Sequence, residues 1–212
     1  GRGGGNGDYG AMERKIVLLN GSQRAPKSNS RRYAAIFREH CPVAADYFEI
    51  TRRNHAMLCS KMDEYTDVVL VFPLYADSLP VSLLDFLKSL EAARSERRPT
   101  VSVMINCGFL EYEQNMVAMD MVRLFCRRNG YPFGSVLMIG GGEAILDTPF
   151  RLLAGRRIAA FARAVAEGRA QSMHVTMPIT KRMFVWASDI YWRMYGRRHG
   201  VSKRQMESMR IE

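Results

Sequence analysis

A loop near the start of the chain gathers the side chains best suited to chemistry. Its sequence over residues 20–30 is NGSQRAPKSNS. Hydroxyls, an amide and two cations lie close together there, and such donors suit the terminal phosphate of a ligand. The donors are Ser22, Arg24, Lys27, Ser28, Asn29 and Ser30. An ordinary capped turn, with Ser28 or Asn29 as the N-cap, is the alternative interpretation.

The segments on either side of this loop predict how it is held. Residues 16–19 are four apolar residues in a row, which is typical of a strand buried on both faces. A helical pattern follows over residues 31–37, with Tyr33, Ile36 and Phe37 on one side. The start of a helix offers free N–H groups and the positive end of its dipole, so this arrangement predicts an anion site.

Apolar runs and amphipathic segments alternate along the rest of the chain. Strands are predicted at 45–50, 67–72, 101–105 and 135–139, and helices at 57–65, 80–93, 111–128 and 149–167. This alternation favours a parallel sheet covered on both faces. We therefore predict an α/β fold with a doubly wound, five-stranded parallel sheet of flavodoxin-like order 2-1-3-4-5. A dinucleotide-binding fold would need a G-x-G-x-x-G loop, whereas Gly21 is the sole glycine of the first loop.

Composition indicates one main domain with appendages. The chain has 212 residues, of which 47% are hydrophobic and 25% charged, as in a soluble globular protein. Residues 1–11 resemble a flexible tag or linker, and Met12 is the expected native start. We assign 12–170 to the predicted flavodoxin-like domain and 171–212 to a basic, amphipathic helical extension.

Charge and cysteine content indicate which partners and which cellular compartment to expect. The net charge is +10, with many of the cations after residue 180. A solvated basic face is the preferred interpretation over binding to nucleic acid or to an anionic membrane surface. The four cysteines are widely spaced and form no CxxC pair, which argues against a zinc site or a disulfide framework. A cytoplasmic location is therefore expected.

Three loops should meet at the carboxyl ends of the strands, where ligands of open parallel sheets bind. They are residues 21–30, 73–80 and 106–111. Tyr75 in the second loop offers an aromatic face to a planar ring. Gly108 in the third lets the backbone approach that ring closely. A phosphate at one end and an aromatic slot at the other describe flavin mononucleotide (FMN).

Four segments carry a resemblance to a known family. NGSQRAPKSNS, VFPLYADSLP, INCGF and GGGE occur in this order between Lys15 and Glu167, and the set resembles the NAD(P)H-dependent FMN reductase group of flavodoxin-like flavoproteins. The resemblance implies that the phosphate is held by Ser22, Arg24, Ser28, Asn29 and Ser30. It implies that the flavin ring is flanked by Pro73, Leu74, Tyr75 and Ala76 on one edge and by Asn106, Cys107, Gly108 and Phe109 on the other.

The function implied is that of an FMN-dependent oxidoreductase, which passes electrons from NADPH or NADH to a small acceptor such as a flavin or quinone. A homodimer is implied as well. No catalytic residue is assigned, although Asp77 and Glu143 are polar candidates. An iron–sulfur cluster, present in some relatives, lacks ligands because Cys59 is the sole cysteine between the second and third predicted strands. The alternatives are a flavodoxin-like electron carrier that docks on redox partners, and a non-catalytic flavin-fold module with a polyanion-binding tail.

Overall fold

The sheet is built from parallel strands in the order β2-β1-β3-β4-β5-β6. The structure, a computed structural model, describes residues 13–22, 28–74, 79–108, 112–141, 145–176, 186, 189–190 and 193–194. The strands are β1 (Ile16–Asn20), β2 (Ala45–Glu49), β3 (Asp67–Pro73), β4 (Thr100–Asn106), β5 (Phe133–Ile139) and β6 (Ser172–Val175). The α-helices of the same residues are α1 (Asn29–His40), α2 (His55–Lys61), α3 (Val81–Ala93), α4 (Tyr112–Asn129) and α5 (Arg151–Ala166).

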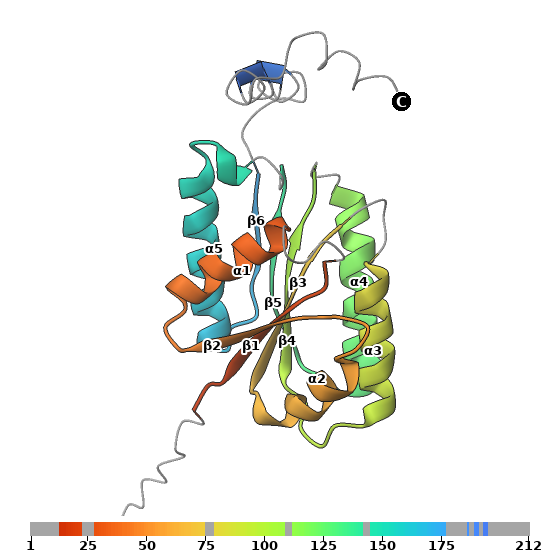
Figure 1. The fold of residues 1–212 in the computed structure, drawn as a ribbon. Helices are drawn as coiled ribbons and strands as arrows, with labels where there is room; N and C mark the ends of the chain where they lie inside the picture. Colours follow the sequence, from red (N-terminus) through yellow and green to blue (C-terminus); the bar gives the residue numbers. More distant parts are fainter. Residues whose placement is uncertain are drawn as a thin grey trace, which may run out of the picture. The chain divides into compact units, whose positions relative to one another are not determined.

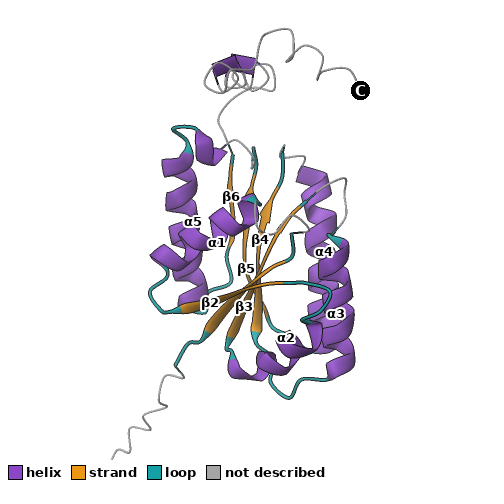
Figure 2. Cartoon of the chain, in the orientation of Figure 1, coloured by secondary structure: helices purple, strands orange, loops and turns teal. Residues whose placement is uncertain are grey.

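Helices cover both faces of the sheet. Figures 1 and 2 show α1 and α5 on one face and α2, α3 and α4 on the other. On the first face, Phe37 of α1 meets Phe161 of α5 edge to face, with ring centroids 5.7 Å apart. Every residue of β1 and of β3 is buried, as expected for strands covered on both sides. The predicted doubly wound α/β fold is confirmed.

The sheet differs from the prediction by one strand. β6 lies beside β5, where Val136 N–H donates to the carbonyl of Gln171 at 2.8 Å and Gly140 N–H donates to that of Val175 at 2.8 Å. Residues 171–176 therefore extend the sheet, although the sequence analysis placed them in the helical extension. A strand of four residues, three of them partly or fully exposed, gives too short an apolar pattern to predict.

The chain divides into two compact units, residues 1–176 and 177–212. The described residues of the second unit are helical, and most of the predicted amphipathic segment lies outside the described residues. Among the helices that the structure describes, none is both long and apolar enough to cross a membrane.

Candidate functional site

The parallel register brings three predicted loops to one edge of the sheet. Asn20, the last residue of β1, pairs with Val71 of β3, and Pro73 at the end of β3 pairs with Asn106 at the end of β4. Leu74 N–H then donates to the Asn106 carbonyl at 2.8 Å. The loops that begin at residues 21, 74 and 107 therefore leave the sheet side by side, at the edge where ligands of this architecture bind.

Asn20 organises the first loop, and the sequence analysis did not single it out. Its side chain is fully buried, and its Nδ2 donates to Tyr47 Oη at 3.0 Å and to Ser28 Oγ at 3.4 Å. Its Oδ1 accepts from Ser22 N–H at 2.9 Å. One amide thus holds both ends of the loop and links them to β2. The sequence signal that could have identified Asn20 is a polar residue directly after an apolar strand.

Ser28 is the N-cap of α1. Its Oγ accepts from Arg31 N–H at 3.3 Å, and its extended backbone turns the chain into the helix. The first turn of α1 therefore starts at the carboxyl edge of the sheet, where its N–H groups and dipole favour an anion. Asn29, also placed here, accepts from Arg32 Nη1 at 3.3 Å. The capped-turn interpretation is confirmed for Ser28, and it is compatible with phosphate binding.

Two predicted site residues contact each other. Ser30 is fully buried, and its hydroxyl donates to Asn106 Oδ1 at 2.9 Å. This bond fastens the first turn of α1 to the end of β4 across the edge. Their roles toward a cofactor stay predictions, because the hydrogen bond shown here is made between the two side chains.

The third loop begins with a buried residue and opens outward. Cys107 is buried, and its backbone N–H donates to the Ile139 carbonyl at 2.9 Å. Gly108 is exposed, its carbonyl accepts from Gly141 N–H at 3.1 Å, and a Cβ built on it would meet nothing within 4 Å. There is open space beside this backbone, as a planar ring needs. Four predicted site residues lie outside the described residues: Arg24, Tyr75, Ala76 and Phe109. So do the polar candidates Asp77 and Glu143.

Helix α3 packs closely against Gly21 at the start of the first loop. A Cβ on Gly21 would lie 3.1 Å from Leu83 Cβ, so this glycine lets α3 pack directly against the loop. Ser82 Oγ donates to the Gly21 carbonyl at 3.0 Å, and Gly21 N–H donates to the Val71 carbonyl at 2.8 Å. The backbone at residue 21 is thereby fixed on both sides.

Charged groups ring the start of α1. Arg31 lies 3.9 Å from Glu49, and Arg32 contacts both oxygens of Asp147 at 2.9 and 3.3 Å. Burial raises the pKa of Tyr47 above its ordinary value of 10.0. Within the described part of the chain, no three His, Cys, Asp or Glu side chains gather as metal ligands would. Amide, hydroxyl and N–H donors at a helix start fit a phosphate group.

Comparison with solved structures shows which proteins share this fold. No protein-family model matches the chain, and no curated protein matches it. An NADPH-quinone reductase structure from P. pentosaceus aligns with a TM-score of 0.56 over 72% of this chain and 97% of that chain, at 13% identity. A flavodoxin from Streptococcus pneumonia aligns with a TM-score of 0.51, covering 72% of this chain and 97% of its own, at 16% identity. The fold is flavodoxin-like.

A third similar structure is a complex with FMN. It is an FMN-dependent NADH-azoreductase from Bacillus anthracis in complex with FMN, with a TM-score of 0.52 and 12% identity over 72% of this chain and 100% of that one. At such identities the likeness is one of fold. It agrees with the resemblance to flavodoxin-like reductases on which the sequence prediction rested.

Proposed function

We propose that the chain binds FMN at the carboxyl edge of its sheet and passes electrons from NADPH or NADH to a small acceptor such as a flavin or quinone. The observation that carries this proposal is the loop held by Asn20, which ends at the N-terminus of α1, where Ser30 bonds to Asn106 of the strand that leads to the open backbone of Gly108. Solved proteins of the same fold are described as quinone reductases and azoreductases, which supports this class of activity.

Each part of the edge has a task in this proposal. The N–H groups of the first turn of α1 and the hydroxyls of Ser22 and Ser28 bind the phosphate. Asn20 fixes the distance between these two serines, so the phosphate site is formed before the ligand arrives. The bound flavin supplies the redox chemistry, and the protein orients its ring and leaves one face open to the nicotinamide. The homodimer is part of this proposal, and light scattering on the eluting protein measures it.

The phosphate site is tested by a substitution that keeps the helix cap. Aspartate caps helices as well as serine does, so Ser28→Asp should leave the free energy of unfolding close to wild type. It places a negative charge where the phosphate would bind. We expect FMN affinity to fall by about tenfold or more, a loss of roughly 1–3 kcal/mol. Riboflavin, which has no phosphate, should bind both proteins equally.

Ser60→Ala is the matched control, because the Ser60 hydroxyl donates to the Met57 carbonyl within α2, which lies on the other face of the sheet from α1. Equal FMN affinity of wild type and Ser28→Asp would disprove the phosphate assignment. The activity is tested separately by anaerobic addition of NADPH to the FMN-loaded protein. Loss of the visible flavin bands supports the reductase. Bands that persist favour the electron carrier.

A further inference from the structure

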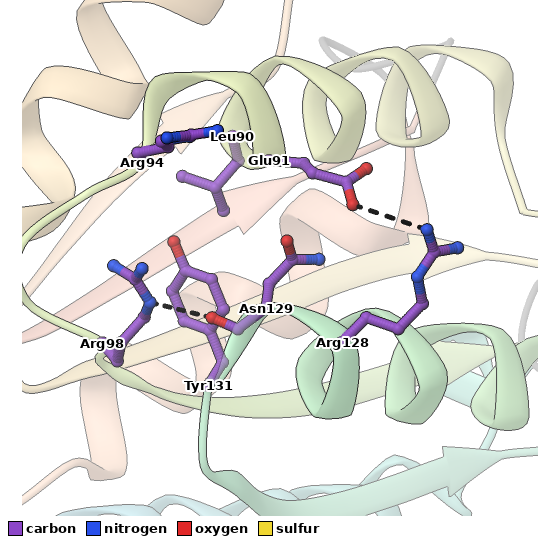
Figure 3. Close-up of a pocket in the computed structure, with 7 residues that line it drawn as sticks. All are labelled: Leu90, Glu91, Arg94, Arg98, Arg128, Asn129 and Tyr131. Atoms are coloured by element: carbon purple, nitrogen blue, oxygen red, sulfur yellow. Dashed lines mark hydrogen bonds and ion pairs between the residues drawn. The ribbon is translucent and has the colours of Figure 1, made fainter.

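A pocket lies at the amino ends of the strands, away from the candidate FMN site. It has a volume of about 380 Å³ and lies between the C-terminal ends of α3 and α4, near the first residues of β4 and β5 (Figure 3). Thr100 begins β4 and Phe133 begins β5, so the pocket is at the amino ends of the strands. The candidate FMN site is at their carboxyl ends, so this pocket belongs to a different part of the molecule.

Cations dominate the pocket. Arg94, Arg98 and Arg128 line it with one carboxylate, that of Glu91. Arg98 is fixed in place, because its Nε donates to the Asn129 carbonyl at 2.8 Å and its guanidinium lies 5.3 Å from the centroid of the Tyr131 ring. Arg128 reaches Glu91 only at 4.0 Å, with both side chains largely exposed. Such a pair holds its charges weakly. Figure 3 shows Arg98 and Arg128 on opposite sides of Asn129.

Arg94 occupies a backbone conformation that favours glycine. It caps the C-terminus of α3 with φ 46° and ψ 55°, and among the described residues it is the one non-glycine residue with positive φ. Left-handed backbone of this kind is sterically costly for a residue with a Cβ and tends to be kept where function requires the side chain. Here the side chain is a cation at the pocket.

A larger depression of mixed charge adjoins this pocket. Arg94 also lines this depression of about 920 Å³, where Arg52 and Arg53 from the loop before α2 lie with the carboxylates of Asp63 and Glu96. The 380 Å³ pocket itself brings together three guanidinium groups, those of Arg94, Arg98 and Arg128. Because their charges add over a few ångströms, they attract an anion of several charges much more than one of a single charge.

We propose that this pocket binds a compact polyphosphate group, meaning a small molecule with two or more linked phosphates. Guanidinium groups present paired donors that match phosphate oxygens. The pocket has the size of small-ligand sites. Phosphates are its ligand rather than an aromatic base, because the Tyr131 ring is buried with Arg98 over it and Phe125 stacked 5.7 Å away. No aromatic face is left at Tyr131 for a base to stack on.

Titration calorimetry with sodium tripolyphosphate at constant ionic strength tests the proposal. Arg94→Gly removes the cation and relieves the backbone, so it should weaken binding by about tenfold while raising the melting temperature. Glu91→Gln removes the competing carboxylate and should tighten binding by a few-fold. Opposite changes in tripolyphosphate affinity at two neighbouring positions near the end of α3 are specific to an anion in this pocket.

Two controls locate the effect. Arg157→Gln removes an exposed cation of α5, on the other face of the sheet, and should leave the affinity within about twofold. Loading the candidate FMN site with FMN before the titration should also leave tripolyphosphate affinity at the pocket unchanged, because the two sites lie at opposite ends of the strands. The proposal is overturned if the wild type shows no binding at about 1 mM ligand, an affinity of only about 4 kcal/mol. It is overturned as well if Arg157→Gln loses as much affinity as Arg94→Gly, or if a single-stranded RNA binds the pocket more tightly than tripolyphosphate.

Discussion

Ser30, in the first turn of α1, donates its hydroxyl to Oδ1 of Asn106 at the end of β4, a residue 76 positions further along the chain, at 2.9 Å. Both side chains are buried. The bond joins the helix that would face a phosphate to the strand that would face a flavin ring. It sets the spacing of the two halves of the candidate site before any ligand binds.

Loss of this bond should be measurable in the protein without flavin. Ser30→Ala leaves Asn106 Oδ1 buried without the hydroxyl donor, and we expect the free energy of unfolding to fall by about 1–3 kcal/mol in urea titrations. In a double-mutant cycle with Asn106→Ala, the two losses should add to more than the loss in the double variant. Additive losses would show that the two side chains do not stabilise each other.

Arg14 should matter more to stability than an arginine with similar contacts at the surface. Its Nη1 contacts both oxygens of Asp67 at 3.0 and 3.2 Å, and Asp67 is only 1% exposed. Arg14→Ala leaves that carboxylate buried with a single hydroxyl donor, Thr66 Oγ1, at 2.7 Å. We expect a loss of about 2 kcal/mol in the free energy of unfolding.

Arg32→Ala is the matched control for Arg14. It breaks a two-pronged contact with Asp147, but both of these side chains are substantially exposed. Exposed pairs contribute about 0–1 kcal/mol, so the expected loss is much smaller. Equal losses in the two variants would contradict the assigned importance of burial at Asp67.

Gly134 should not tolerate a side chain. An added Cβ would lie 2.5 Å from Ser102 Oγ and 2.8 Å from Thr100 Cγ2, at the point where the register of β4 and β5 shifts. Ser102 cannot move freely, since its Oγ accepts from Ser135 N–H at 3.0 Å. Gly134→Ala should therefore cost about 1–3 kcal/mol of stability. Gly155→Ala within α5, where a Cβ meets nothing, should instead stabilise by about 0.5–1 kcal/mol.

Stability should fall as the solution becomes alkaline. Burial raises the pKa of Cys126 to about 12 from an ordinary value of 9.0. Between these two pH values the unfolded chain releases the thiol proton while the folded chain keeps it, so the free energy of unfolding decreases as pH rises. Burial also raises the pKa of Tyr65 and of Tyr131, and both act in the same direction.

The contribution of the thiol can be separated by substitution. Cys126→Ala should lower stability at neutral pH by creating a small cavity, yet its stability should decline less steeply than wild type above about pH 9. Urea titrations at a series of pH values measure both slopes. Parallel slopes would mean that Cys126 does not keep its proton in the folded state.

The fold was predictable because its strongest signals are local. Residues 16–19 and 68–72 are continuous apolar runs, which are typical of strands covered on both faces. The parallel arrangement then determines which loops share an edge. The meeting of the loops after β1, β3 and β4 therefore followed from the order of elements, without knowledge of any side-chain contact.

The direction of each polar side chain was not predictable in the same way. Asn20 acts through Ser22, Ser28 and Tyr47, and the last of these belongs to another strand. Ser30 was predicted to donate to a phosphate, and its partner in the structure is Asn106. Contacts of this kind depend on packing between distant segments, which no local pattern encodes. The arginine pocket was missed for the same reason, since α3, α4 and the residues between them each supply part of it.

β6 has a consequence for how copies of the chain behave toward each other. It occupies the hydrogen-bonding edge of β5, a strand whose last five residues are buried. A chain shortened before Ser172 would present that apolar edge with unpaired N–H groups, which is the template on which strands of separate molecules add and aggregate. The four residues of β6 thus protect the edge of β5 from aggregation through strand addition.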